Sequence, residues 1–499
     1  MATAATKTFK NFIGGEWVDA VSGENFETTS PATGETLGVF PRSSAEDVDR
    51  AVEAAKNTFD DWRLTPAPRR GEILFRFGQL LAERKDEVAE LMAREMGKVL
   101  PEAAGDVQEA IDMSFYMGGE GRRLFGQTTP SELRDKFNMS VRQPIGVVGV
   151  ITPWNFPIAI PSWKIAPALV CGNTVVFKPA TDTPLLGERF VELLVEAGVP
   201  AGVINIVHGG GGEVGDRLVR HPDVPVITLT GSRETGVEVM RNAADHLKHI
   251  HLELGGKNAI IVLDDADLDL AVEGIIWSAF GTSGQRCTAA SRVVVQEGAY
   301  EELQKRLVKA AEKLRLGPGW EEGVDVGPVI NKRALEKIHS YTEIGVDEGA
   351  KLLTGGEVAD GNGLGEGFFY RPTIFGDVDP EMRVAQEEIF GPTTALIRVR
   401  DVDEAIRVSN GIEFGLSSSI FTRDVNTAFR AMRDLEAGIT YINAGTIGAE
   451  VHLPFGGTKA TGNGHREAGQ AALDVFTEWK SIYVDYSRKL QKAQIDTGD

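Results

Sequence analysis

Short runs of β-branched residues alternate with longer amphipathic stretches through the middle of the chain. The runs that predict buried strands are 146–151, 173–177, 203–207, 226–229 and 259–263. Between them lie stretches with helical spacing, such as 184–197, in which leucine and phenylalanine recur at the period of a helix face. Buried strands that alternate with helices predict right-handed βαβ units and a parallel sheet, which binds ligands at the carboxyl ends of its strands.

A second α/β pattern follows further along the chain. It predicts a helix over 268–280, a strand over 291–295, a helix over 301–314 and strands over 393–399 and 418–421. The polar loop GTSGQRC joins the first helix to the first strand. The last segment, 475–487, alternates as a strand. Because an isolated strand must pair with something, we expect it to join either its own sheet or that of a second subunit.

Composition indicates a globular protein and excludes several classes. The 499 residues are 42% hydrophobic and 25% charged, and 52 Lys plus Arg against 73 Asp plus Glu give a net charge of −21. At roughly 150 residues per domain, this length allows about three domains. No basic run is present, so a nucleic-acid or anionic membrane surface is not expected. The first twenty residues contain no apolar stretch of signal-peptide length, which favours a cytoplasmic protein.

Two glycine-rich turns are candidates for binding a nucleotide. Gly210, Gly212 and Gly215 form G-x-G-x-x-G directly after a predicted strand. However, the acidic residue that would bind a ribose, expected about twenty residues further along the chain, is not clearly present. The turn could equally be a tight strand-to-helix connection. Gly231 and Ser232 follow the strand VITL and open a helix, whose free amides suit an anion. The sequence therefore predicts a nucleotide more firmly than it predicts one particular turn.

The two cysteines lie in different surroundings. Cys171 is flanked by apolar residues and is interpreted as a small buried hydrophobe. Cys287 follows Arg286 in a polar loop and precedes a possible helical turn at 288–291, and both features would favour a thiolate. Cys287 is thus a candidate nucleophile, with an inert thiol as the alternative. So low a cysteine count also suggests a reducing compartment.

A cysteine nucleophile needs an oxyanion donor and a base. Asn155, in the loop TPWNFP at a strand end, is a candidate donor, and Glu253, in HLELGG, is a candidate base. The alternatives are a turn asparagine and a surface glutamate. Three histidines cluster at 246, 249 and 251, but without HExxH or a nearby cysteine pair we predict no metal site.

Eight motifs together resemble the aldehyde dehydrogenase superfamily in order and spacing. They are TPWNFP (152–157), WK (163–164), FKPA (177–180), LTGS (229–232), LELGGK (252–257), GQRC (284–287), EEIFGP (387–392) and LPFGG (453–457). The resemblance implies an α/β fold with a Rossmann-like cofactor domain over 1–125 and 145–255. It also implies an α/β catalytic domain over 256–470 and a small β oligomerisation arm over 126–144 and 471–499.

The resemblance also implies a mechanism. Cys287 would attack the aldehyde carbon as a thiolate, and the amide of Asn155 with the backbone N–H of Cys287 would hold the oxyanion. Hydride transfer to the nicotinamide would leave a thioester, and Glu253 would activate the water that hydrolyses it. Lys164 would help to relay protons. Relatives that pass the acyl group to coenzyme A generally lack this glutamate, so a free carboxylic acid is the expected product.

The cofactor implied by the resemblance is NAD or NADP. Lys178 would bind the adenosine ribose, Ser232 the pyrophosphate and Glu388 the nicotinamide ribose. The full expected set is Thr152, Pro153, Trp154, Lys178, Ala180, Thr181, Gly212, Gly231, Ser232, Leu254, Glu388 and Phe390. NAD-preferring relatives often carry a glutamate where this chain has Thr181. Without that carboxylate, we expect dual or NADP-leaning specificity.

Substrate and assembly are the last expectations from the resemblance. Arg286 recurs in relatives that act on carboxylated or phosphorylated aldehydes, and LPFGGTKATGNGHREAG resembles microbial semialdehyde dehydrogenases. A guanidinium could pair with a substrate carboxylate, or it could point away and brace the loop. Trp163, Thr288 and Phe455 would line the substrate tunnel. We expect a homodimer or homotetramer with a small-molecule aldehyde as its substrate.

Two other functions fit part of the sequence. A cofactor-independent thiol hydrolase or amidase would also use a cysteine, but it normally needs a histidine partner, and no histidine is tied to Cys287 in the sequence. A catalytically idle structural member of the family would tend to lose the nucleophile. This chain keeps Cys287, Asn155 and Glu253.

Overall fold

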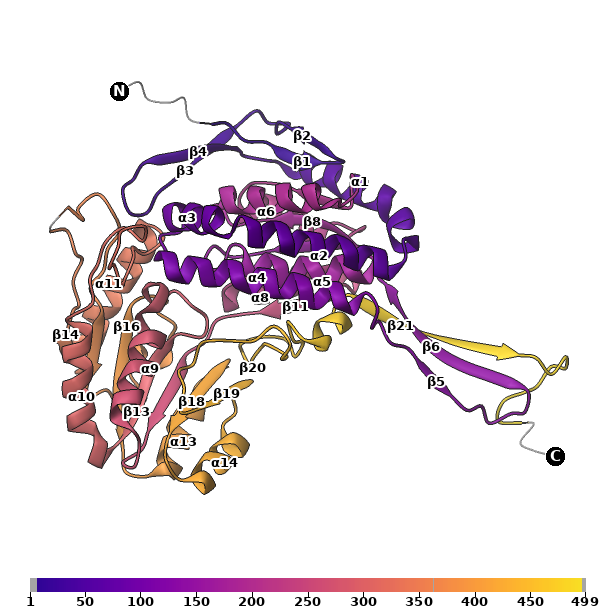
Figure 1. The fold of residues 1–499 in the computed structure, drawn as a ribbon. Coiled ribbons are helices and arrows are strands. Elements are labelled where there is room, and N and C mark those ends of the chain that lie inside the picture. The colour runs from indigo at the N-terminus through magenta and orange to yellow at the C-terminus, as the bar shows by residue number, and fades with distance from the viewer. Residues whose placement is uncertain (1–6, 362, 496–499) are drawn as a thin grey trace.

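The computed structural model describes residues 7–361 and 363–495. It has two α/β bodies side by side and a slender β arm that projects from them (Figure 1). Each body is built on a seven-stranded sheet, and the arm is a three-stranded sheet. The neighbouring solved structures described below share this architecture. The predicted α/β fold is confirmed.

The first sheet consists mainly of parallel strands. Its order is β11 (His249–Glu253), β10 (Val226–Thr230), β7 (Val147–Ile151), β8 (Thr174–Lys178), β9 (Ile204–Ile206), β1 (Asn11–Ile13) and β2 (Glu16–Val18). The strands from β11 to β9 are parallel, and β1 and β2 run antiparallel at one edge. The central strands are buried along their whole length, except for the last residue of β7, which explains their continuous apolar runs.

Helices cover the first sheet and connect its strands. They are α1 (Ala45–Leu64), α2 (Ala67–Glu83), α3 (Lys85–Glu95), α4 (Leu100–Glu120), α5 (Ala159–Cys171), α6 (Pro184–Ala197), η1 (Gly211–Gly215), α7 (Asp216–Arg220), α8 (Arg233–Ala243) and η2 (Ala244–His246). The helix α6 coincides with the predicted stretch. Pro184 stands in its first turn and Gly198 ends it in the left-handed conformation, as expected for a helix with these terminal residues.

The second sheet combines strands from the rest of the chain. Its order is β14 (Lys351–Thr354), β15 (Thr373–Gly376), β16 (Thr393–Val399), β13 (Ala290–Gln296), β12 (Asn258–Val262), β18 (Ser417–Phe421) and β19 (Ile439–Ile442). Its helices are α9 (Leu268–Phe280), η3 (Gly281–Gly284), α10 (Glu297–Ala311), α11 (Lys332–Asp347), α12 (Arg383–Gln386), α13 (Val402–Asn410) and α14 (Val425–Asp434). Short elements complete the fold, namely β3 (Asn25–Thr29) with β4 (Thr36–Pro41), β17 (Phe414–Gly415) with β20 (Thr458–Lys459), and η4 (Gln470–Asp474).

Two predictions about local structure are wrong. The run at 259–263 was grouped with the first sheet, but it forms β12 in the second sheet, and β11 is the strand that extends the first sheet. No helical turn follows Cys287 either, because β13 begins at Ala290. The short helix η3 lies before the cysteine instead.

The arm pairs the C-terminal strand within its own chain. The strand β21 (Thr477–Asp485) runs antiparallel to β6 (Lys136–Pro144) over nine residue pairs, and β5 (Gln127–Thr129) lies on the other side of β6. Trp479 and Tyr483 on β21 are exposed. The strand β21 therefore joins a sheet of its own chain, in which it is an edge strand.

The structure also bears on Cys171 and on the predicted domains. Cys171 is buried in the core of the first body, and burial raises the pKa of its thiol to about 12, as fits a structural residue.

The division into three domains stays a prediction, and its residues 1–6 and 496–499 lie outside the described residues. Within the described ranges, no helix has the length and apolar character required to cross a bilayer.

Candidate active site

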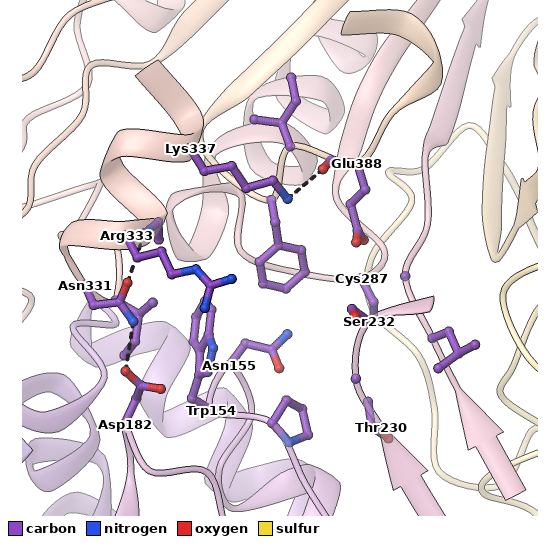
Figure 2. Close-up of a pocket in the computed structure, with 18 residues that line it drawn as sticks. Trp154, Asn155, Asp182, Thr230, Ser232, Cys287, Asn331, Arg333, Lys337 and Glu388 are labelled. Carbon is purple, nitrogen blue, oxygen red and sulfur yellow. Dashed lines mark hydrogen bonds between the residues drawn. The ribbon is translucent and has the colours of Figure 1, made fainter. Parts of the chain in front are cut away.

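The two bodies meet at a groove with a volume of about 590 Å³ (Figure 2). From the first sheet come the loops that follow β7, β10 and β11, at the carboxyl ends of parallel strands. From the second body come the loop that carries Cys287, the start of α11 and the segment before β16. This is the position at which sheets of this kind bind ligands.

One side of the groove offers donors to an anion. Ser232 caps α8, and its Oγ accepts a hydrogen bond from the backbone N–H of Thr235 at 3.3 Å. The first turn of that helix also directs amide hydrogens and the positive end of the helix dipole toward the groove. A phosphate group therefore fits this position.

The opposite side presents a carboxylate beside aromatic rings. Glu388 accepts a hydrogen bond from the backbone N–H of Gly256 at 2.9 Å. A Cβ at Gly255 would lie 2.4 Å from the same carboxylate, so a larger residue there would displace the Glu388 side chain. Phe390 packs edge-on against Trp154 with ring centroids 5.6 Å apart. A carboxylate beside an aromatic pair suits a ribose hydroxyl and a planar ring.

Some of the predicted cofactor residues line this groove and others lie outside it. The lining includes Pro153, Trp154, Gly231, Ser232, Leu254, Glu388 and Phe390. The lining residues do not include Thr152, Lys178, Ala180, Thr181 or Gly212. The second group clusters around Lys178, whose carbonyl accepts a hydrogen bond from the backbone N–H of Thr152 at 3.3 Å.

Lys178 lies next to the glycine-rich turn. Its Nζ donates to the carbonyl of Pro179 at 2.7 Å, and burial lowers its pKa to about 8. A Cβ at Gly215 would contact the Lys178 side chain at 3.6 Å. The side chain of Thr181 is exposed just beyond this strand. The structure thus brings the FKPA motif and the glycine turn together.

The helix α11 contributes polar groups that sequence reasoning missed. Asn331 caps this helix and donates to Asp182 at 2.9 Å, while Lys337 donates from Nζ to the carbonyl of Glu388 at 2.9 Å (Figure 2). Arg333 also lines the groove. The asparagine followed by a helical pattern could have indicated the helix start, but no local signal connects it to a loop so distant in sequence.

The loop that carries Cys287 is held from both sides. The carbonyl of Cys287 accepts from Nδ2 of Asn258 at 2.7 Å, and Nδ2 of Asn155 donates to the carbonyl of Gln285 at 3.0 Å. Thr282 and Ser283 adopt positive φ values of 52° and 55° in the preceding turn. Asn155 is buried, and it lines the groove together with Cys287. The amide that was predicted as an oxyanion donor therefore lies beside the candidate nucleophile.

The electrostatics of Cys287 differ from the expectation. Burial, together with the carboxylates of Glu253, Glu388 and Glu467, raises the pKa of its thiol well above the ordinary range. Arg286 does not offset this, because its guanidinium donates to Thr282 at 2.9 Å and pairs with Glu102 at 3.2 Å. No helix starts after Cys287, although the backbone N–H of Thr288 still lowers the pKa of the thiol and partly offsets the effect of burial and of the carboxylates.

Glu253 ends β11 in a buried acidic pocket. It is 1% exposed, and neither of its carboxylate oxygens has a hydrogen-bond partner among the described residues. Burial and the nearby Glu467 raise the pKa of Glu253 well above its usual value. Lys164 forms a buried ion pair with Glu467 and donates to Thr228 at 3.0 Å. Glu467 was missed, because nothing in its local sequence connects it to Lys164, 303 positions earlier.

A smaller cavity of about 60 Å³ continues inward from Cys287. All four predicted substrate residues line it, and they are Trp163, Arg286, Thr288 and Phe455. The rings of Trp163 and Phe455 meet edge-on at 5.1 Å. Glu109 of α4 lines the same cavity and was not predicted. Burial and the nearby Asp106 raise its pKa to about 7.

The histidine cluster is dispersed in the structure. His249 pairs with Glu478 at 2.8 Å on the surface, whereas His251 is buried against Thr228. Over the part of the chain that the structure describes, no group of three or more His, Cys, Asp or Glu side chains could hold a metal ion.

Comparison with known proteins gives consistent matches along almost the whole chain. The model of the aldehyde dehydrogenase family matches residues 17–482. The chain is 44% identical to the alpha-ketoglutaric semialdehyde dehydrogenase of Bacillus subtilis (strain 168), covering 96% of this chain and 98% of that protein. It is 41% identical to the NADP(+) succinate-semialdehyde dehydrogenase of Escherichia coli (strain K12), with 95% and 97% covered. The crystal structure of betaine aldehyde dehydrogenase from Staphylococcus aureus, in complex with NAD+, is 34% identical with a TM-score of 0.94, and 96% of each chain is covered.

Proposed function

Because the chain belongs to the aldehyde dehydrogenase family, we propose that its substrate is a short aldehyde that carries a carboxylate, a semialdehyde of a dicarboxylic acid. The protein is an oxidoreductase that converts an aldehyde to an acid with NAD+ or NADP+. A thiol hydrolase and an idle structural protein are not favoured. The observation that carries the substrate proposal is Arg286, which lines the inner cavity together with Cys287.

Two groups of opposite charge would select the substrate. The guanidinium of Arg286 is shared with Glu102, so its attraction for a substrate carboxylate is reduced but not removed. Glu109, in the same cavity, repels a carboxylate when it is ionised and can donate a hydrogen bond when it is protonated. The names of the relatives support an acidic substrate, because both include the word semialdehyde.

The first half of the reaction would begin with proton removal from Cys287. Glu253 lines the same inner cavity, and its raised pKa suits it to accept the thiol proton. The sulfur then forms a bond with the aldehyde carbon, and the oxyanion accepts hydrogen bonds from Asn155 and the backbone N–H of Cys287. The oxyanion collapses to a carbonyl as the C–H electron pair leaves as hydride, so a thioester remains on the sulfur.

The second half would hydrolyse that thioester. Glu253 first releases the thiol proton and then takes a proton from water as the oxygen attacks the acyl carbon. The carbon–sulfur bond breaks to release the acid and the thiolate, and the thiolate takes the proton back from Glu253. The net change consumes aldehyde, water and oxidised cofactor, and it yields the acid, reduced cofactor and one proton. That proton must leave a site in which Glu253 is 1% exposed.

The groove fits a nicotinamide dinucleotide. Ser232 would hold the pyrophosphate, Glu388 a ribose, and Lys178 the adenosine ribose, while Trp154 and Phe390 would pack alongside. The bound cofactor supplies the acceptor for the hydride. We further propose dual or NADP-leaning use, because the position of Thr181 carries no carboxylate that would repel a 2′-phosphate.

Assembly through the arm is also part of the proposal. The strand β21 lies at an edge of its sheet and exposes Trp479 and Tyr483, which supports pairing with a second copy of the chain. Light scattering should give a mass of at least twice the chain. Cys171 and Cys287 are both free thiols, which supports a reducing compartment such as the cytoplasm.

The test compares a carboxylated aldehyde with an uncharged aldehyde of equal length, following NAD(P)H absorbance. We expect kcat/KM to favour the carboxylated aldehyde by about tenfold or more, as for one charge-assisted contact. Arg286→Met should reduce this preference, whereas the matched control Arg286→Lys should keep most of it. Cys287→Ala should abolish turnover of both aldehydes. A preference that survives Arg286→Met would refute the role of Arg286, and a flat absorbance with every aldehyde would refute the proposed function.

A further inference from the structure

The buried histidine His251 lies beside Thr228, which contacts the buried ion pair of Lys164 and Glu467. His251 is 2% exposed on β11, and its Nδ1 lies 2.9 Å from Oγ1 of Thr228. Its Nε2 is buried and has no hydrogen-bond partner among the described residues. The proposed function gives this side chain no role. A buried ring with one nitrogen engaged and the other free of a partner requires an explanation.

On its inner side, His251 connects to the groups around Glu253. Thr228 Oγ1 accepts a hydrogen bond from Nζ of Lys164 at 3.0 Å, and Lys164 forms the buried ion pair with Glu467. Nδ1 of His251 also lies 3.8 Å from a carboxylate oxygen of Glu467. Glu467 lines the same inner cavity as Glu253, and it raises the pKa of Glu253.

On its outer side, His251 faces a second histidine at the surface. The rings of His251 and His465 lie 6.1 Å apart between centroids, and His465 is exposed. The segment with His465 is fixed along β11, because Asn463 accepts from the backbone N–H of Leu252 at 3.0 Å. It also donates to the carbonyl of Ile250 at 2.5 Å. The rings of His251 and His465 therefore lie one after the other between the buried pocket of Glu253 and the surface.

We propose that His251 and His465 carry the proton that Glu253 collects out to solvent, by way of Glu467, Lys164 and Thr228. This inference rests on the proposed role of Glu253 as the base. The family resemblance brought only Lys164 into proton transfer, whereas the histidine pair extends the path from the buried pocket to the surface.

The electrostatics favour a relay through a neutral ring. Burial, with Lys164, His465 and Arg466 nearby, lowers the pKa of His251 well below its ordinary value, so the ring does not hold a charge. In a concerted shift, Glu467 passes the proton from Glu253 to Lys164, Lys164 gives one to Thr228, Thr228 gives its hydroxyl proton to Nδ1 of His251, and Nε2 releases its proton to His465. One proton enters the ring and one leaves it, and the ring regains its Nε2–H tautomer before the next turnover.

The outer histidine is suited to release that proton. Burial and the neighbouring His249 lower the pKa of His465, so it gives up a proton readily at neutral pH, although Asp474 acts in the opposite direction. Neither His251 nor His465 would therefore hold the proton as a stable cation.

The experiment separates formation of the thioester from its hydrolysis. Rapid mixing of enzyme, aldehyde and NAD(P)+ measures a burst of NAD(P)H from the first half and a steady rate that includes the second. In His251→Phe, which fills the space but cannot relay, the burst should stay unchanged while the steady rate falls by about tenfold to a hundredfold. In His251→Ala, added imidazole should restore much of the steady rate.

A variant of an exposed histidine serves as the control. His246→Gln alters an exposed histidine of η2 and should leave both phases unchanged. A parallel loss of burst and steady rate in His251→Phe, or no loss in either, would overturn the relay, as would an equal loss in His246→Gln. Failure of the proposed function looks different, because the unaltered protein would then produce no NAD(P)H at all.

Discussion

Substrate choice should depend on pH through Glu109, which faces the inner cavity beside Cys287. Burial and Asp106 raise the pKa of Glu109 to about 7, while Lys98 and Arg286 act in the opposite direction. Below this value the carboxyl is neutral and can donate a hydrogen bond to a carboxylated substrate. Above it the group is ionised, repels the substrate and competes for Arg286. The preference for carboxylated aldehydes should therefore fall as the pH rises.

The size of the effect follows from the titration. With a pKa of about 7, roughly nine-tenths of Glu109 is protonated at about pH 6 and roughly one-tenth at about pH 8. If only enzyme with protonated Glu109 binds the carboxylated substrate, kcat/KM for that substrate falls about tenfold over this interval, relative to an uncharged aldehyde. The ratio of the two substrates removes the influence of other groups that titrate, because such groups act on both.

The assay records kcat/KM for both aldehydes across this pH range, in the unaltered enzyme and in Glu109→Gln. Glutamine keeps the shape of the side chain and stays neutral, so the ratio should become independent of pH at the value seen for the unaltered enzyme near pH 6. A ratio that is flat in the unaltered enzyme, or one that still falls in Glu109→Gln, would refute the reasoning.

Three further predictions concern the cofactor and the buried acids. Thr181→Glu should lower kcat/KM for NADP+ relative to NAD+ by about tenfold or more, because a carboxylate near a 2′-phosphate is repulsive; an unchanged ratio would count against it. Lys164→Met should lower the thermal midpoint by roughly 3–5 °C, since it leaves the buried carboxylate of Glu467 uncompensated, and Lys164→Met with Glu467→Gln should regain much of that loss in the same melting experiment. Glu253→Gln removes a charge that raises the pKa of Cys287, so only the loss of the base can slow alkylation of this thiol by iodoacetamide; we expect a slower rate, and an equal or faster rate would show that Glu253 does not accept the thiol proton.

Local periodicity was sufficient to predict several elements. The amphipathic stretch at 184–197 and the apolar stretch at 268–280 coincide with α6 and α9, because their spacing and terminal residues define a helix locally. The predicted helix at 301–314 begins four residues earlier, as α10 (Glu297–Ala311), since Gln296 ends the preceding strand directly. Sheet membership was harder to predict, because it depends on contacts between distant segments.

Side-chain direction was the other limit. Adjacency in the sequence suggested that Arg286 acts on Cys287, yet its guanidinium turns to Glu102, which lies 180 positions before the neighbouring Thr282. Glu109 was missed for the same reason, since only the packed structure brings α4 to the inner cavity. Residue types and motif order identified the candidate site, but their partners are set by tertiary packing.

The raised pKa of Cys287 has a chemical use in this arrangement. A thiol that stays protonated at rest resists oxidation and stray alkylation, because the thiolate is the reactive form. Burial and the nearby Glu467 also raise the pKa of Glu253, so the proton affinity of the carboxylate rises together with that of the thiol. A proton can then pass from sulfur to carboxylate when substrate arrives. At rest, the buried carboxylates of Glu253, Glu388 and Glu467 thus disfavour the thiolate of Cys287. During the reaction, Glu253 at the end of β11 is the base that forms this thiolate.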